Sequence, residues 1–214
     1  MAAIDLNADL GEALGDDDAM LGIATSAHDS CVVHAGAPLT SPRTVATTAA
    51  RGVSVGAHPS DDDREHFGRR SLDVPPDRLT AEVLHQLGAL QAHALASGTR
   101  VAYVKPHGAL YNVIVPDKAQ AAVVAAVAVF SPGLPVLGLP GSLVFRLAAD
   151  AGLRPVAEAF ADRASTADGT LAARSQPGSV LHDPDAAVGQ ALSIATQGWA
   201  RTVDAGVTLA PFAP

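Results

Sequence analysis

Apolar residues recur at two spacings along the chain, and segments of the two kinds alternate. Short runs with period two or unbroken apolar character, such as residues 53–59, predict strands that are half or fully buried. Longer stretches with a 3.6-residue period predict helices, and the clearest begins at residue 75. Its apolar face carries Leu79, Val83, Leu87 and Leu90. The alternation recurs about seven times, which predicts parallel strands joined by right-handed crossovers.

The expected elements fill the chain without a break in composition, so we predict a single domain over residues 1–214. The expected strands are residues 4–10, 31–36, 53–59, 101–104, 135–139, 155–160 and 206–209. The expected helices are residues 16–23, 42–51, 75–97, 117–130, 143–151 and 183–197. Polar residues follow at least four strands that would not be neighbours at the crevice of an open sheet. A β/α barrel is therefore favoured over a doubly wound sheet.

The first expected strand alternates strictly between apolar and polar residues. One face would carry Leu6, Ala8 and Leu10, and the other Asp5, Asn7 and Asp9. Three polar residues on one face suit either a polar cavity or a solvent-exposed edge strand, and this segment alone does not choose between the two.

Histidines stand at the ends of three expected strands, at positions 34, 58 and 107. One such histidine would more often be a satisfied core residue, but three ends converge only at one face of a parallel sheet or barrel. Residues 103–112 add Lys105, Tyr111 and Asn112 to His107 within a loop shaped by a proline and a glycine. We take this stretch as the centre of a candidate site, with an ordinary strand-to-helix loop as the alternative.

Residues 61–70 form a charged loop that includes Arg64 and Arg69. It is either a solvated loop or a site loop whose arginines bind a carboxylate or phosphate. Residues 174–178, beginning with Arg174, resemble a polar loop of the same kind.

Composition narrows the class of protein. The chain has 214 residues, 48% of them hydrophobic and 17% charged, with a net charge of −8 and one cysteine. The acidic balance argues against nucleic acid and anionic membranes as partners. The single cysteine and the absence of a signal peptide or bilayer-length apolar run favour a cytoplasmic protein.

Several blocks together resemble the LamB/YcsF family. They are residues 5–12, 34–36, 56–60, 63–64, 67–69, 105–112 and 158–163, in the family's order. The resemblance implies a seven-stranded β/α barrel of the glycoside hydrolase/deacetylase type. It also implies ATP-dependent hydrolysis of 5-oxo-L-proline (pyroglutamate) to L-glutamate, with this chain as the A subunit of a 5-oxoprolinase that acts beside subunits B and C.

The chain departs from the family pattern in two places. Where the family usually reads Asn-x-x-Cys-Gly-Phe-His-Ala-Gly-Asp, the residues are His28, Cys31, Val32, Val33, His34, Ala35, Gly36 and Ala37. The family's His-Gly-Asp and final helix are also not seen in residues 209–214. We therefore expect a barrel that lacks its closing helix. A subunit contact could cover the open seam, and a homo-oligomer is one form that this contact could take.

The resemblance and the chemistry of lactam opening suggest roles for particular residues. The proposed catalytic residues are Asp9, His58, Lys105 and His107, with Asp9, His58 or His107 as the general base. The proposed substrate-binding residues are Asn7, Glu12, His34, Arg64, Arg69, Tyr111, Asn112, Asp162, Arg163 and Arg174. No Gly-x-x-x-x-Gly-Lys-Ser/Thr loop is present in the sequence, so we expect a partner subunit to carry out the chemistry of ATP.

Two other functions are consistent with the sequence. One is a metal-dependent carbohydrate or amide deacetylase, with Asp9, His34 and His58 as weak candidates for divalent metal ligands. The other is a degenerate subunit that binds a small acid or a partner without turnover, which the altered segment after His28 would favour.

Overall fold

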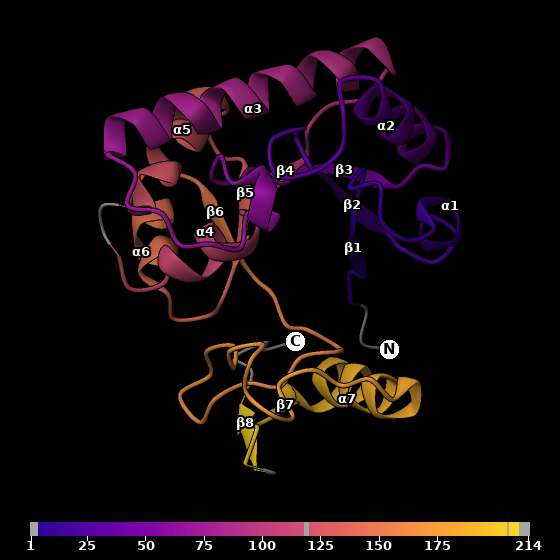
Figure 1. The fold of residues 1–214 in the computed structure, drawn as a ribbon, viewed down its shortest axis with the longest axis vertical. Coiled ribbons are helices and arrows are strands. Elements are labelled where there is room, and N and C mark those ends of the chain that lie inside the picture. The colour runs from indigo at the N-terminus through magenta and orange to yellow at the C-terminus, as the bar shows by residue number, and fades with distance from the viewer. Residues whose placement is uncertain (1–3, 118–119, 205, 210–214) are drawn as a thin grey trace. The chain divides into compact units, whose positions relative to one another are not determined.

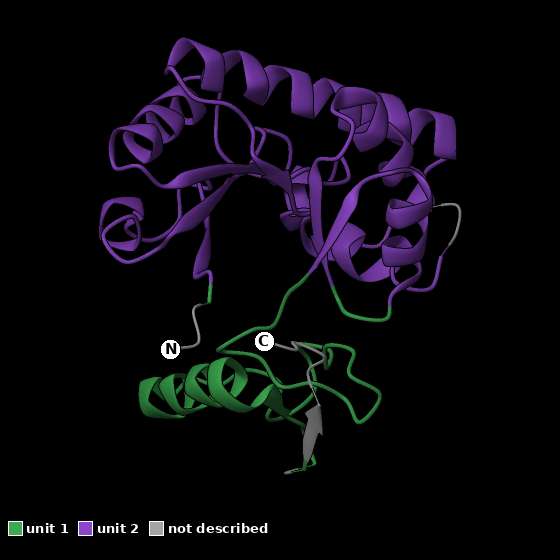
Figure 2. Cartoon of the chain, turned by 180° about the vertical axis from the view of Figure 1, so that it is seen from behind, with its two compact units in different colours: residues 1–4, 139–141, 157–214 green, residues 5–138, 142–156 purple. Residues whose placement is uncertain are grey.

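The structure is a computed structural model that describes residues 4–117, 120–204 and 206–209. Contacts divide the chain into two compact units (Figure 2). Unit 2 comprises residues 5–138 and 142–156, and unit 1 comprises residues 1–4, 139–141 and 157–214. That the whole chain acts as one domain stays a prediction.

A six-stranded sheet organises unit 2, and its strands follow one another in chain order (Figure 1). The strands are β1 Asn7–Leu10, β2 Ser26–Asp29, β3 Ser54–Ala57, β4 Tyr103–Val104, β5 Pro135–Gly138 and β6 Arg154–Ala157. Neighbours from β1 to β5 pair in parallel. The predicted α/β class with parallel pairing is confirmed. The strand order also lacks the reversal of a doubly wound sheet.

Helices connect these strands. They are α1 Asp17–Met20, α2 Thr40–Ala50, α3 Pro76–Ala96, α4 Gly108–Val113, α5 Val123–Phe130 and α6 Leu143–Asp150, with short 3₁₀ helices at Arg64–His66 and Gln120–Ala122. The long helix α3 packs against α2 and α5 (Figure 1). Its predicted apolar face is fully buried and joins Val55 and Val104 of the sheet in one hydrophobic core. This core holds the ends of β3 and β4 in place.

The second strand was predicted at the wrong place. Residues 31–36 form a turn, and β2 lies earlier, at Ser26–Asp29. Cys31 and Val32 have φ angles of 51° and 63°, values that no extended strand allows. The segment of β2 was missed because three of its four residues are polar, although all four are buried. His34 therefore lies in a loop after β2, not at a strand end.

Two other predictions need correction. Leu6 was expected on the buried face of the first strand, but β1 begins at Asn7, just after Leu6, and Leu6 is 48% exposed. Ala8 and Leu10 are buried as predicted. Residues 108–112 were expected to be a loop, whereas they form most of α4. The helix predicted from residue 117 includes residues 118–119, which lie outside the described residues.

Unit 1 contains the helix α7, Pro184–Gln197, and the antiparallel strands β7, Trp199–Arg201, and β8, Val207–Leu209. The side chain of Asp183 caps α7 by accepting from the backbone N–H of Asp185. The strand β7 was not predicted. Residues 210–214, where the family's final segment was expected to be missing, lie outside the described residues. Among the helices that are described, none has the length and apolar character needed to cross a membrane.

Candidate functional site

The register of the sheet places four residues in one row across β1 to β4. Asp9 pairs with His28, His28 with Gly56, and Gly56 with Tyr103. The ring of Tyr103 fills the space above Gly56, where a Cβ atom would lie 2.3 Å from ring carbons. The same ring meets His28 edge-on, with 5.2 Å between centroids. Because Gly56 of β3 has no side chain, the ring of Tyr103 has room to pack against His28.

The next layer on this face comes from the residues that leave the strands. His58 and Lys105 lie two positions beyond Gly56 and Tyr103, so they share the face of that row. Both converge on Asp9. Its Oδ1 lies 3.0 Å from His28 Nδ1, 3.5 Å from His58 Nε2 and 3.5 Å from Lys105 Nζ. The side chain of Asp9 is still 40% exposed, so the cluster opens to solvent at this carboxylate.

Electrostatics keeps Asp9 ionised and the imidazoles of His28 and His107 neutral. Burial opposes the charge of Asp9, but attraction to His58 and Lys105 outweighs it and holds the pKa of this carboxyl well below its usual value. Burial, together with the positive charge of Lys105, lowers the pKa of His28 to about 4. Burial likewise lowers the pKa of His107 to about 3. At neutral pH these two imidazoles are therefore uncharged.

A second carboxylate and two more imidazoles complete the cluster. Glu12 Oε1 lies 3.1 Å from His34 Nε2 and 3.8 Å from His107 Nδ1. The rings of His34 and His107 stack in parallel, with centroids 3.7 Å apart. His107 Nδ1 also lies 2.9 Å from His58 Nε2. Burial raises the pKa of Glu12, so its charge is less secure than that of Asp9.

The loops that carry these side chains interlock through glycines. A Cβ atom at Gly108, where φ is 58°, would lie 2.2 Å from the carbonyl oxygen of Gly68. That carbonyl accepts a 2.8 Å hydrogen bond from Ala109 N–H, and His107 N–H donates to Pro59 O at 2.8 Å. The loops after β3 and β4 are thus held against each other by backbone contacts. Their fixed geometry explains why His58 and His107 meet.

Four of the residues could hold a metal ion. The ligand atoms of Asp9, Glu12, His58 and His107 all lie within 4.8 Å of one another. The predicted metal ligands were Asp9, His34 and His58. The structure retains two of these three, adds Glu12 and His107, and places His34 behind them against Glu12.

The predicted arginines of the loop after β3 take different positions. Arg64 donates to the carbonyl oxygen of Gly36 and so braces the loop after β2. Arg69 is exposed, and its guanidinium lies 4.9 Å from the ring centroid of Phe67. Its positive charge also lowers the pKa of Glu12, against the larger effect of burial. The charge of Arg69 therefore acts on the carboxylate of Glu12.

The remaining predicted residues of unit 2 take part in none of the cluster contacts described above. Asn7 is half-buried on β1, on the same face as Asp9. Tyr111 is buried on α4. Asn112 is exposed, and its side-chain amide donates to Gly108 O within the same helix at 2.9 Å.

Three predicted residues belong to unit 1. Asp162 and Arg174 are exposed. Arg163 is buried, and its guanidinium donates to two backbone carbonyl oxygens, that of Ala172 at 2.6 Å and that of Ser179 at 3.3 Å.

The sequence did not single out His28 as a site residue. His28 is fully buried, and its Nε2 is a buried atom without a hydrogen-bond partner in the part of the chain that the structure describes. Residues 26–28 alternate between polar and apolar residues with the same period of two as β1. This alternation was the signal in the sequence that could have identified a strand with His28 on its polar face.

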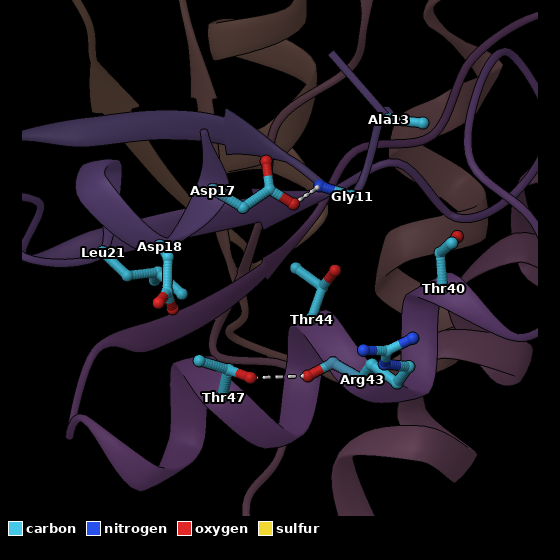
Figure 3. A pocket seen from close by; sticks show the side chains of 9 residues that line it. All are labelled: Gly11, Ala13, Asp17, Asp18, Leu21, Thr40, Arg43, Thr44 and Thr47. Atoms are coloured by element: carbon cyan, nitrogen blue, oxygen red, sulfur yellow. Dashed lines mark hydrogen bonds between the residues drawn. The ribbon is translucent and has the colours of Figure 1, made fainter. Parts of the chain in front are cut away.

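A separate cavity of about 250 Å³ lies between α1 and α2 (Figure 3). Its lining includes Gly11, Ala13, Asp17, Asp18, Leu21, Thr40, Arg43, Thr44 and Thr47. Asp17 accepts from Gly11 N–H at 3.1 Å, which fixes the loop next to Glu12. None of the residues predicted for the site lines this cavity.

Comparisons with known proteins show similarity along most of this chain. The model of the LamB/YcsF family matches residues 4–210. A relative from Mycobacterium avium (strain 104), named as the A subunit of 5-oxoprolinase, is 56% identical over 210 residues, which is 95% of this chain and 83% of the relative. A relative of the same name from Streptomyces coelicolor (strain ATCC BAA-471 / A3(2) / M145) is 55% identical over 207 residues, 94% of this chain and 83% of the relative.

The fold has a solved counterpart. The structure of the Lactam Utilization Protein from Thermus thermophilus is 42% identical and superposes with a TM-score of 0.91. The match covers 96% of this chain and 86% of that chain. On the family match and these identities, the chain belongs to the LamB/YcsF family.

Proposed function

We propose that this chain is the A subunit of a 5-oxoprolinase, which opens 5-oxo-L-proline to L-glutamate in the cytoplasm. The observation that carries the proposal is the name that the relatives share, the A subunit of 5-oxoprolinase, at identities as high as 56% along 95% of the chain. The cluster around Asp9 supports it, because an ionised carboxylate, neutral imidazoles and a lysine are the groups that amide hydrolysis needs.

The reaction assigns a task to each group. Water adds to the lactam carbonyl carbon, the ring carbon–nitrogen bond breaks, and the nitrogen takes up a proton to become the amino group of glutamate. His58 and His107, whose Nε2 and Nδ1 atoms lie 2.9 Å apart, are with Asp9 our candidates for the general base that accepts a proton from water. Lys105, beside Asp9, is placed to stabilise negative charge on the carbonyl oxygen. Arg69 is our candidate for binding the substrate carboxylate, with Asn7, on the same face of β1 as Asp9, as a further polar contact.

ATP and partner subunits belong to the same proposal. The sequence contains no phosphate-binding loop of the Gly-x-x-x-x-Gly-Lys-Ser/Thr type, so we assign activation of the lactam by ATP to subunits B and C. Lys105 would then meet either an oxyanion or a phosphate on the activated lactam. We also keep the seven-stranded barrel as a proposal, since the chain-order sheet is the order that such a barrel would have.

A metal-dependent deacetylase-like hydrolase is the second candidate function. The observation that favours it is the group of four possible ligands, Asp9, Glu12, His58 and His107. Two imidazoles and two carboxylates form a donor set found in hydrolytic metal sites.

The test is glutamate release from 5-oxo-L-proline, measured with the chain alone, with subunits B and C, and with ATP present or omitted. We expect release only in the complete mixture with ATP. If the folded chain gives no glutamate in any mixture, the proposal is wrong. Release of acetate from acetylated sugars or amides would then favour the deacetylase, whereas 5-oxoproline binding without turnover would identify a non-catalytic subunit.

A further inference from the structure

Two backbone carbonyls fix which nitrogen of each central imidazole carries its proton. His58 Nδ1 lies 2.7 Å from Lys105 O, and His107 Nε2 lies 2.9 Å from Phe67 O. A carbonyl oxygen only accepts, so each of these nitrogens must be the N–H donor. In the neutral ring the other nitrogen then carries a lone pair and no proton. The free lone pairs are on His58 Nε2 and His107 Nδ1.

These two lone pairs face each other. His58 Nε2 and His107 Nδ1 are 2.9 Å apart, which is hydrogen-bond distance, yet neither neutral ring has a proton to place between them. Both histidines are buried, so water cannot readily separate them. The contact is stable only if a positive species lies between the two nitrogens. That species is either one proton or a metal ion.

The surroundings favour a metal ion. Asp9 Oδ1 lies 3.5 Å from His58 Nε2, and Glu12 Oε1 lies 3.8 Å from His107 Nδ1. Two carboxylates thus flank the two lone pairs, and the four ligand atoms all lie within 4.8 Å of one another. A proton would join only two of these atoms, whereas a metal ion can bind all four. Around zinc, with bonds of about 2.0–2.1 Å, tetrahedral ligand atoms lie about 3.3 Å apart. The observed separations between neighbouring ligand atoms, 2.9, 3.5 and 3.8 Å, lie on both sides of that value.

The groups that contact the four possible ligands are also arranged as they are around a bound metal ion. Histidines that bind metals donate their other N–H to a carbonyl or carboxylate, which fixes the tautomer. His58 and His107 both do so through Lys105 O and Phe67 O. Each carboxylate has an imidazole of its own behind it, since His28 contacts Asp9 at 3.0 Å and His34 contacts Glu12 at 3.1 Å.

We propose that His58 Nε2, His107 Nδ1, Asp9 and Glu12 bind one divalent first-row transition metal ion, with zinc as the best fit to two imidazoles and two carboxylates. The proposal does not depend on the reaction proposed above, because binding of the ion is measured without substrate, ATP or partner subunits. Its failure would leave 5-oxoprolinase activity open, and a lack of that activity would leave metal binding intact.

The first experiment is a calorimetric titration of the full chain with zinc chloride after dialysis against a chelator. We expect one ion per chain. His58→Gln and His107→Gln should each weaken binding by more than about 100-fold, because each removes a direct ligand. His34→Gln, which removes the imidazole that contacts Glu12 and stacks on His107, should weaken it about 10-fold. His85→Gln is the matched control, since His85 is exposed on α3, and binding should be unchanged.

A second measurement covers the case in which the variants fail to fold. Nitrogen chemical shifts of ¹⁵N-labelled histidines in the unaltered chain should change on zinc addition at His58 Nε2 and His107 Nδ1, while His58 Nδ1 and His107 Nε2 stay protonated. The proposal is overturned if the folded chain binds no zinc, or if both glutamine variants bind it as the unaltered chain does. A proton that remains between the two nitrogens in excess zinc would overturn it as well.

Discussion

The imidazoles of unit 2 and Arg163 of unit 1 are both buried polar groups that the sequence placed in the site, yet their contacts differ. The guanidinium of Arg163 donates to two backbone carbonyls, so its known hydrogen bonds serve its own loop. His58 and His107 each give one nitrogen to a carbonyl and turn the other toward a second acceptor. A buried group whose polar atoms all meet complementary partners stabilises a fold, whereas acceptors that face acceptors indicate a place for a ligand.

The largest effect is expected at Asp9. Asp9→Asn removes the charge that meets His28, His58 and Lys105 while keeping the size of the side chain. Glutamate release by the complete mixture should fall by about 10² to 10⁴-fold. Asp62→Asn is the matched control, since Asp62 is an exposed carboxylate, and it should retain activity. Equal losses in the two variants would remove Asp9 from the site.

Arg163→Met should act on stability instead. The substitution keeps the apolar stem but deprives the carbonyls of Ala172 and Ser179 of their charged donor. We expect a loss of about 3 kcal/mol in the free energy of unfolding, measured by urea denaturation. Activity per folded molecule should change little. An inactive variant of normal stability would instead support Arg163 as a substrate ligand.

Asp61 extends the comparison to a third buried group. Its Oδ1 is a buried atom that has no hydrogen-bond partner within the described residues. Burial, with added repulsion from Glu82 and Asp63, raises the pKa of Asp61 from 3.8 to about 6. The folded state therefore binds its proton more tightly than the unfolded state, and stability falls as the pH rises from about 4 to about 6.

Asp61→Asn should remove that pH dependence. Above about pH 6 the variant should be more stable than the unaltered chain by as much as about 3 kcal/mol, and below about pH 4 the difference should vanish. Urea denaturation at several pH values measures it. A difference that does not vary with pH would show that Asp61 is ionised at no cost in the folded state.

Gly56→Ala tests how the sheet supports His28. The new Cβ atom would lie 2.3 Å from the ring of Tyr103, so the ring must move. We expect a loss of about 1–3 kcal/mol in the free energy of unfolding. In a Tyr103→Leu background the same substitution should cost less, because the ring is gone. Additive costs would show that the ring and Gly56 are not coupled.

The smallest effect is expected at Asn112. Its side chain is exposed and donates only within α4, so Asn112→Ala should change the free energy of unfolding by less than about 0.5 kcal/mol. Activity in the complete mixture should also be retained. A large loss of activity would return Asn112 to the group of substrate ligands predicted from the sequence.

Local patterns predicted the elements whose burial follows a simple period. The helix α3 is amphipathic, and β3 is a short apolar run, so both lie close to their predicted positions. The strand β2 was missed because its inward face is built from Ser26 and His28, and polar residues on a buried strand resemble a loop. Its pattern is explained only by Asp9 and Tyr103, which are distant in sequence.

The same limit applies to the site. Histidines at the ends of strands indicated that His58 and His107 would converge, and the structure brings them within 2.9 Å. The sequence could not indicate that Lys105 O and Phe67 O fix their tautomers, because the positions of backbone carbonyls depend on the tertiary packing of two loops. It also could not assign Arg163 its carbonyl partners, since an arginine after a strand has the same local pattern in either role.

The most direct test measures Asp9→Asn and Arg163→Met together, with glutamate release and urea denaturation recorded on the same preparations. We predict that Asp9→Asn is stable and inactive, and that Arg163→Met is unstable but active per folded molecule. An active Asp9→Asn variant beside a stable, inactive Arg163→Met variant would contradict this and would move the site away from the imidazole cluster.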